Sequence, residues 1–310
     1  MRILVTGASG FIGRAVTASL LRQGHHVIAP SRRLLHISHQ SLQNPLIDDI
    51  EMLGAMPAWL SGCQVVIHIA AKAHLTDVSL TDYRRSNTDA TLALARAASA
   101  VGCKRFIFLS SIGVNGVNNN SPFTVDDKPA PVEDYAISKL EAELALRQLA
   151  AETALQWVII RPPLVYGPDA PGNFGKLSRL AQKNLPLPFG AIHNKRSLVA
   201  LDNLVDLIIT CIEHPAAANQ TFLVSDDNDV STTQLLQLMS RAAGKKPRLL
   251  PVPVSWLRFA AKLTGKQTII DRLCGNLQVD ITHTKKTLGW VPPITVEEGV
   301  LRCFLKEELC

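Results

Sequence analysis

The chain opens on MRILVTGASGFIG, over residues 1–13, and this stretch strongly constrains the fold. Ile3–Val5 is an apolar run typical of a buried parallel strand. Three glycines follow at three-residue spacing, and residues 14–23 have the apolar stripe of a helix. A strand, a glycine-rich turn and a helix start together present backbone N–H groups to a pyrophosphate, and a Cβ in the turn would block that approach. We therefore predict a dinucleotide site built from Gly7, Ser9, Gly10, Phe11, Ile12 and Gly13.

Composition fits a globular enzyme. The 310 residues suffice for one large α/β unit or a core domain with a smaller lobe, and 47% of them are hydrophobic and 19% charged. No apolar run reaches the length of a membrane span, and the first strand leaves no room for a signal peptide, so a cytoplasmic protein is expected. The six cysteines form no CxxC pair and no zinc-type cluster. We expect reduced thiols and no metal site.

The net charge of +6 is modest and spread along the chain. It suits an anionic small ligand and is compatible with contact at a membrane surface. Because the basic residues form no long run, nucleic acid is not an expected partner.

The first half of the chain alternates strands and helices. This alternation predicts an α/β fold with a doubly wound parallel sheet of the Rossmann type. Strands are expected at 27–29, 64–70, 104–109 and 156–161, with a short third strand that ends at 46–47, and helices are expected at 82–101 and 132–152.

After Arg161, prolines and glycines cluster and the pattern changes. We predict an NAD(P)-binding Rossmann-like domain over 1–161 and a small substrate-binding lobe over 162–310, interleaved with late elements of the sheet. Ligands of such sheets lie at the carboxyl ends of the strands, so functional residues should follow the strands directly. Later strands are expected at 197–200, 221–224, 249–253 and 277–279, with helices at 202–213, 232–243 and the C-terminus.

A second motif suggests chemistry. Tyr135 and Lys139 stand four residues apart, on one face of a predicted helix, and Ser110 and Ser111 end a predicted strand. A lysine ammonium beside a phenol lowers the tyrosine pKa, which would make Tyr135 a usable proton donor or acceptor. A serine hydroxyl could bind the same substrate oxygen. This set suits hydride transfer between a carbon atom and a nicotinamide.

Together with further segments, these motifs resemble those of the extended short-chain dehydrogenases/reductases of the NAD(P)-dependent epimerase/dehydratase kind, over nearly the whole length of the chain. The segments that carry the resemblance are TGASGFIG, VIHIAA (66–71), NTDATLALARAA, FLSSIGVNG (108–116), YAISK, RPPLVYGP (161–168), RSLVALDNLVD (196–206) and LGWVPP (288–293).

The resemblance implies roles for individual residues. Ser111, rather than Ser110, takes the catalytic serine position beside Tyr135 and Lys139. Asp49 resembles the acid that meets the adenine amine, with Asp48 as the alternative one register away. Further implied cofactor contacts are Ala70, Ala71, Lys72, Asn87, Tyr135, Lys139 and Pro162, and implied substrate contacts are His74, Ser111, Ile112, Asn173 and Arg196, the last at the diphosphate. The resemblance also implies a homodimer formed through the helices at 82–101 and 132–152.

Departures from the family pattern narrow the reaction. Dehydratases carry Asp-Glu after the catalytic hydroxyl residue, whereas this chain has Ile112 and Gly113, so elimination of water is not expected. Many epimerases have asparagine where Leu164 stands, and Asn173 with Phe174 could serve instead. His68, inside a strand, is expected to be structural, whereas Tyr83 could face either the sugar or the surface.

The second predicted strand ends without the acid that usually binds the ribose 2′-hydroxyl of NAD. Arg32 and Arg33 stand there and could bind a 2′-phosphate, which slightly favours NADP over NAD. They could equally be solvated loop charges.

These features predict an NAD(P)-dependent enzyme acting at C4 of a nucleotide sugar resembling UDP-N-acetylhexosamine. Its reaction would be 4-epimerisation, and reduction of a UDP-4-keto-6-deoxy-N-acetylglucosamine with NADPH is the alternative. A catalytically silent NAD(P)-binding regulatory protein is a further alternative, which the retained Ser111, Tyr135 and Lys139 disfavour.

Overall fold

The computed structural model describes residues 1–48, 57–73 and 78–305. Its centre is a seven-stranded sheet in the order β3-β2-β1-β4-β5-β6-β9, in which every neighbouring pair is parallel. The chain order reverses between β1 and β4, which is where doubly wound sheets bind their ligands. The predicted fold class is confirmed. The strands are β1 (Arg2–Thr6), β2 (His26–Ile28), β3 (Leu42–Gln43), β4 (Val65–His68), β5 (Arg105–Leu109), β6 (Gln156–Arg161) and β9 (Gln220–Leu223).

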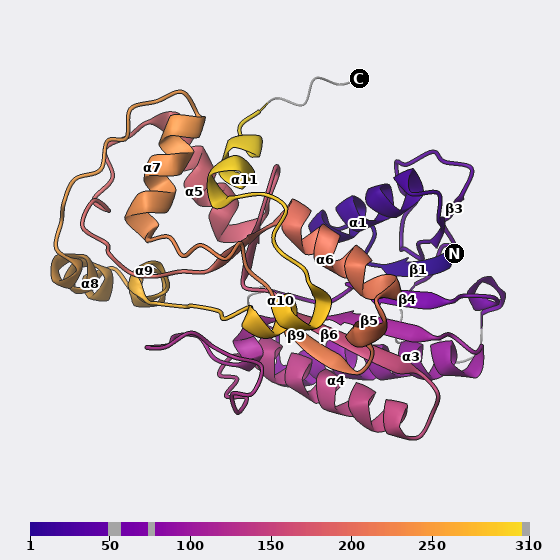
Figure 1. Cartoon of the computed structure of the whole chain (residues 1–310). Helices are drawn as coiled ribbons and strands as arrows, with labels where there is room; N and C mark the ends of the chain where they lie inside the picture. Colours follow the sequence, from indigo (N-terminus) through magenta and orange to yellow (C-terminus); the bar gives the residue numbers. More distant parts are fainter. Residues whose placement is uncertain (49–56, 74–77, 306–310) are drawn as a thin grey trace.

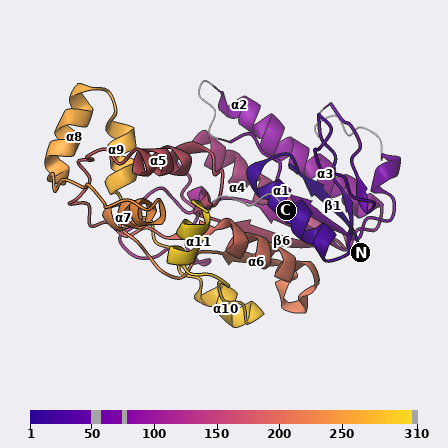
Figure 2. The ribbon, with the colours of Figure 1, turned by 90° about the horizontal axis from the view of Figure 1, so that it is seen from above.

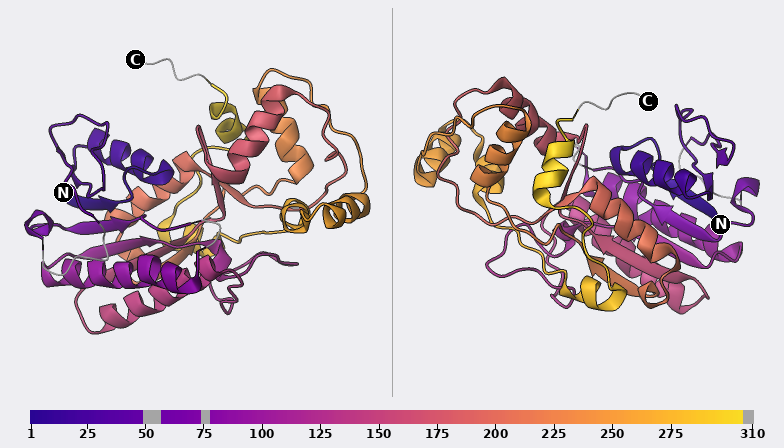
Figure 3. Two further views of the ribbon diagram at one scale, coloured as in Figure 1. Left: turned by 180° about the vertical axis from the view of Figure 1, so that it is seen from behind. Right: turned by 45° about the horizontal axis from the view of Figure 1, so that its top comes forward.

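Helices cover both faces of the sheet (Figures 1 and 3). On one face lie α1 (Phe11–Arg22) and α6 (Leu201–Glu213), and on the other lie α3 (Ala90–Ala100) and α4 (Asp134–Ala151). Alternate residues of each strand supply the two cores, since Ile3 belongs to the cluster under α1 and α6 and Leu4 to the cluster under α3 and α4. The strands are apolar on both sides because both faces are covered.

The smaller lobe is built mainly from the second half of the chain (Figure 2). Its short parallel pair is β7 (Leu164–Tyr166) and β8 (Leu198–Ala200), and a third apolar cluster, which includes Tyr166, fills its interior. Residues after 161 also return to the main sheet as α6 and β9. The remaining helices are α5 (Gly172–Lys183), α7 (Thr232–Ala242), α8 (Val254–Leu263), α9 (Gln267–Cys274), α10 (Thr282–Leu288) and α11 (Val296–Arg302).

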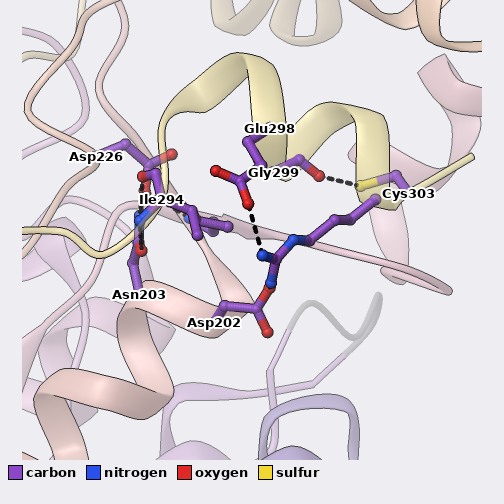
Figure 4. Close-up of polar contacts among 9 residues, drawn as sticks. Asp202, Asn203, Asp226, Ile294, Glu298, Gly299 and Cys303 are labelled. Atoms are coloured by element: carbon purple, nitrogen blue, oxygen red, sulfur yellow. Dashed lines mark hydrogen bonds and ion pairs between the residues drawn. The ribbon is translucent and has the colours of Figure 1, made fainter. Parts of the chain in front are cut away.

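One buried carboxylate joins the lobe to the sheet (Figure 4). Asp226, just after β9, accepts hydrogen bonds from the Tyr166 hydroxyl (2.7 Å), the Asn203 side chain (2.7 Å) and the Ala200 backbone (2.8 Å). Asn203 in turn exchanges hydrogen bonds with the backbone of Ile294. Burial raises the pKa of Asp226, and the three donors oppose that shift. The Asp226 carboxylate thus holds the ends of β7 and β8, the start of α6 and the segment after β9 together.

Several predicted boundaries were wrong. The third strand lies at Leu42–Gln43, because Pro45 has no N–H to donate and Leu46 forms only an isolated bridge to Ser31. The segments 249–253 and 277–279 likewise contain no strand. The first has one isolated bridge, at Leu249, and includes two prolines, and the second has two isolated bridges, at Leu277 and Val279. The helix predicted at 82–101 begins earlier, as α2 (Leu80–Tyr83), and passes through a π-helical stretch at Arg84–Asp89 before α3.

The close packing of α1 on β1 yields a stability prediction. A Cβ on Gly13 would lie 2.0 Å from the Gly7 carbonyl oxygen, so Gly13→Ala should lower the free energy of unfolding by about 3 kcal/mol or more. Gly102→Ala is the matched control, since Gly102 has φ +75° and open space around it, and should cost only about 1–2 kcal/mol. Urea denaturation followed by circular dichroism measures both. Equal losses would contradict the clash assigned to Gly13, which lies inside α1 and has no positive φ.

Candidate active site

The first part of the site lies where the loops that follow β1 and β4 meet. Thr6 holds the two loops together, because its Oγ1 accepts hydrogen bonds from the backbone N–H groups of Ile69 (3.2 Å) and Ala70 (3.1 Å). Gly7 has φ +72°, and a Cβ there would lie 2.9 Å from the Ala70 nitrogen. The loops therefore approach closely only because residue 7 is glycine.

The start of α1 follows the first of these loops directly. Gly10 caps the helix without any side chain, so the N–H groups of the first turn meet no capping oxygen. Ser9 and Gly10 are exposed, and Phe11 and Ile12 are half-buried. Free N–H groups, the positive end of a helix and the lack of a covering side chain fit the pyrophosphate of a dinucleotide.

The predicted catalytic residues gather at the carboxyl end of β5. Lys139 on α4 donates a hydrogen bond from Nζ to the carbonyl oxygen of Leu109, at 2.9 Å. Two residues further on, the Ser111 hydroxyl accepts a hydrogen bond from the Gly113 backbone (3.1 Å). Tyr135 lies one turn before Lys139, with its ring centroid 5.9 Å from Nζ. The fold thus brings together the serine, tyrosine and lysine that the motifs indicated.

The pKa of Tyr135 differs from the sequence expectation. Burial raises this pKa, and the neighbouring Tyr83, whose ring stands edge-on at 6.1 Å, adds to the shift. Lys139 does not offset it, because burial lowers the pKa of Lys139 itself to about 7 while Glu143 opposes that change. The direction is therefore opposite to the lowering of the Tyr135 pKa that its spacing to Lys139 predicted. Tyr83 is a packing neighbour of Tyr135.

A buried ionic network lies directly behind these residues. Glu143, one turn after Lys139, accepts hydrogen bonds from Ser110 Oγ (2.5 Å) and from Arg161 Nε (2.9 Å) and Nη2 (2.5 Å). Arg161 also donates to Asn115 Oδ1 at 2.9 Å. The network links α4 to the ends of β5 and β6 and to the loop after Ser111. Sequence analysis missed it, although Glu143 follows Lys139 at the same four-residue spacing that singled out Tyr135 and Lys139.

A second network supports α4 from the β4 side. Asn87, in the π-helical stretch, accepts a hydrogen bond from the backbone nitrogen of Lys72 (2.9 Å) and donates to its carbonyl oxygen (3.1 Å). Asn87 also donates to Ser138 Oγ (3.0 Å), and Ser138 donates to the Tyr135 carbonyl oxygen. Asn87 therefore ties the predicted cofactor loop to the helix that carries Tyr135. Contact between its side chain and a cofactor remains a prediction.

His68 has the structural environment that was expected. Its ring is buried and hydrogen-bonded to Thr6 Oγ1 (2.7 Å) and Thr91 Oγ1 (3.0 Å), and it stacks on Phe108. Burial lowers the pKa of His68 to about 3, with Lys139 adding to the shift, so the ring stays neutral at physiological pH.

Arg196 lies at the junction with the lobe. Its Nη1 donates to the carbonyl oxygens of Arg272 (2.6 Å) and Gly275 (3.2 Å) at the end of α9. The Arg272 side chain pairs with Glu133, which caps the start of α4. Two guanidinium groups therefore stand close to the helix that carries Tyr135, and Arg272 had no motif to reveal it.

Other predicted residues lie apart from this cluster or have a packing role. Ile112 is buried in the main core, and its backbone N–H donates to the carbonyl oxygen of Pro162. Asn173 is exposed in the first turn of α5. Phe174, expected to assist it, instead packs in the lobe core against Tyr166. Because its ring is buried in that core, the expectation that Phe174 assists Asn173 in a substrate contact is corrected.

The loop after β2 carries the residues meant to select the cofactor. Arg32 and Arg33 are exposed there, and Ala71 is exposed after β4. Asp48 is also exposed, whereas Asp49 and His74 lie outside the described residues.

The described residues contain neither a metal-binding cluster nor a membrane-spanning helix. Within residues 1–48, 57–73 and 78–305, no group of three or more His, Cys, Asp or Glu side chains could hold a metal ion. None of the helices in the same ranges has both the length and the apolar character required to cross a bilayer.

The sheet order, the glycine turn and the Ser111–Tyr135–Lys139 cluster define a Rossmann-type enzyme of the short-chain dehydrogenase/reductase class. A profile of the NAD dependent epimerase/dehydratase family matches residues 3–225. The chain belongs to this family.

Relatives and solved structures agree with this assignment. A UDP-glucose 4-epimerase of Vibrio cholerae is 47% identical over 304 residues, covering 96% of this chain and 92% of the relative. An N-acetyl-α-D-glucosaminyl-diphospho-ditrans,octacis-undecaprenol 4-epimerase of Escherichia coli O157:H7 is 28% identical, with 98% and 95% coverage. The crystal structure of a UDP-glucose 4-epimerase with UDP-glucose from Thermotoga maritima superposes with a TM-score of 0.79, at 26% identity and with 98% and 97% coverage.

The buried network gives a test of its own. Glu143→Gln would leave Arg161 without its charged partner, so the free energy of unfolding should fall by about 3–5 kcal/mol. Glu298→Gln breaks an exposed pair with Arg302 and should cost less than about 1 kcal/mol. Chemical denaturation of both variants gives the comparison. A loss at Glu143 no larger than that at Glu298 would contradict the role assigned to the network.

Proposed function

We propose that this protein is a UDP-hexose 4-epimerase that inverts C4 of UDP-glucose or of its N-acetylated counterpart. The observation that carries the proposal is the placement of Ser111, Tyr135 and Lys139 at the end of β5, in a sheet whose first strand leads through a glycine turn into α1. The 47% identity to a UDP-glucose 4-epimerase supports this reaction, and now favours the unsubstituted hexose over the N-acetylhexosamine first expected.

In the proposed reaction each residue has a distinct task. Tyr135 takes the proton of the C4 hydroxyl and later returns it. A nicotinamide, when bound, would accept and return the hydride of C4. Ser111 donates a hydrogen bond to the same oxygen. The positive charge of an oxidised nicotinamide would favour the phenolate form and so counter the raised pKa of Tyr135.

The substrate diphosphate is assigned to Arg196, with Arg272 beside it. The Arg196 guanidinium keeps N–H groups beyond those used on the Arg272 and Gly275 carbonyls, and planar forks of this kind suit phosphate oxygens. Burial and the neighbouring Arg272 charge both lower the pKa of Arg196, so an anion between the two guanidinium groups would relieve their repulsion.

Packing at Gly113 supports epimerisation over dehydration. A Cβ there would lie 3.2 Å from the Ala136 Cβ and 3.3 Å from Ser111 Oγ. The position that holds a catalytic acid in dehydratases therefore has little space for a longer side chain here.

The cofactor is proposed to be NAD or NADP. The family description names NAD, whereas the exposed Arg32 and Arg33 would accept a 2′-phosphate. Mass spectrometry of the nucleotide released from purified, denatured protein would distinguish the two.

We also propose a homodimer through the outer sides of α3 and α4, where Leu144 is exposed. The buried Ala90, Ala95 and Ala98 pack inside the chain and do not contribute to this surface. Sedimentation velocity should give a dimer, and a monomer at all concentrations would contradict the proposal.

The reaction is tested with purified protein and three substrates. UDP-glucose and UDP-N-acetylglucosamine should each be offered with NAD, and a UDP-4-keto-6-deoxy sugar with NADPH. Interconversion of epimers without net change in NADPH supports the epimerase. Loss of NADPH in proportion to the keto sugar would instead identify the reductase, and no turnover of any substrate would favour the regulatory alternative.

Tyr135→Phe removes only the proton-transferring hydroxyl. Turnover should fall by about a hundredfold to ten-thousandfold, while the protein still binds its dinucleotide. Epimer ratios over time and the content of bound nucleotide are the two measurements. Turnover within a few-fold of the unmodified enzyme would remove Tyr135 from its assigned role.

A further inference from the structure

The outer side of α8 carries large apolar side chains in contact with solvent. Trp256, Phe259 and Leu263 are 72%, 68% and 73% exposed. Their spacing of three and four residues places them on one helix face, which we call the outer stripe. The opposite face holds the buried Leu257 and Ala261, through which α8 packs on the lobe. The outer stripe is therefore a second apolar face, not needed to dock the helix.

The charge around this stripe has one sign. Seven basic residues and no acidic residue stand between Asp229 and Asp271. Arg258 and Lys262 lie on α8 beside the stripe, and Lys266 lies in the turn that leads to α9. Arg258 is paired with Asp271 at 3.4 Å. Lys262 and Lys266 form no ion pair within the described residues.

We propose that the outer stripe of α8 docks this protein on the surface of an anionic lipid bilayer. An indole and a phenyl ring suit the boundary between headgroups and acyl chains, and Lys262 and Lys266 would meet anionic headgroups while their stems lie along the apolar surface. Charge complementarity selects this partner. A second copy of the same basic segment would bring like charges together, which opposes self-association through this face.

The position of α8 agrees with such contact. Figures 1 and 2 both place it at the outer end of the small lobe, on the side away from β1. α9 packs against α8, and its last turn includes Arg272, whose carbonyl oxygen accepts the Arg196 hydrogen bond. The docking surface thus lies on the small lobe, away from the glycine turn between β1 and α1.

Vesicle co-sedimentation of the full chain tests the proposal. The probes are vesicles of phosphatidylcholine alone and of equal parts phosphatidylcholine and phosphatidylglycerol. The protein should sediment with the anionic vesicles and be released by salt. The double variant Trp256→Ser/Phe259→Ser should bind the anionic vesicles more weakly by about tenfold or more. Its turnover of a water-soluble UDP-sugar should be unchanged. Val291→Ser, at a residue 61% exposed elsewhere, is the matched control and should bind normally.

A charge variant separates the two contributions. Lys262→Gln/Lys266→Gln should weaken binding to anionic vesicles by roughly tenfold or more, since each basic residue near such a surface contributes about fivefold. Absence of vesicle binding, or equal binding to neutral vesicles, would overturn the proposal. So would an oligomer of the unmodified protein that dissociates in the Trp256→Ser/Phe259→Ser variant without any vesicle binding, because the stripe would then be a contact between copies. None of these results depends on which sugar the enzyme uses.

Discussion

The active-site geometry depends on a pair of buried charges that fix α4 to the end of β5. Lys139 binds the carbonyl oxygen of Leu109, and one helical turn later Glu143 binds the hydroxyl of Ser110. The last residue of β5 and the residue after it are thus held by two consecutive turns of one helix, and Ser111 follows directly. Buried charges are costly unless their hydrogen bonds are satisfied, and here Arg161 and Asn115 complete the set. The interaction therefore serves position more than net stability.

The rest of the site is arranged around this clamp. Asn87 and Ser138 connect α4 to the loop after β4. This loop and Tyr135 therefore share one support. Glu133 and Arg272 connect the start of α4 to the lobe, where Arg196 lies. On the far side Asp226 joins the lobe to α6 and β9. A substrate held by the lobe would consequently be placed against groups that are positioned by the sheet.

Sequence reasoning succeeded where the signal is local. The glycine turn, the buried strands and the four-residue step from Tyr135 to Lys139 each occupy a short stretch, and their physical meaning does not depend on distant residues. The carboxyl-end rule then brought Ser111 and Tyr135 together, since parallel strands end at one edge of a sheet.

It failed where the answer depends on residues far apart in the chain. Ser110, Glu143 and Arg161 are unremarkable separately, and only the fold shows that they share one buried network. The pKa of Tyr135 follows its burial and Tyr83, which spacing to a lysine cannot reveal. Phe174 was expected to assist Asn173 in a substrate contact, yet helix geometry turns its ring into the lobe core. The third strand was displaced by Pro45, whose effect depends on which backbone groups face β2.

The central claim is that hydrogen leaves C4 of the sugar and returns to the same carbon within one site, beside Tyr135. UDP-glucose that carries deuterium at C4 tests this most directly. The UDP-galactose formed should retain the deuterium at C4, with none lost to water or to added unlabelled NADH. Epimerised product that has lost the label would contradict it.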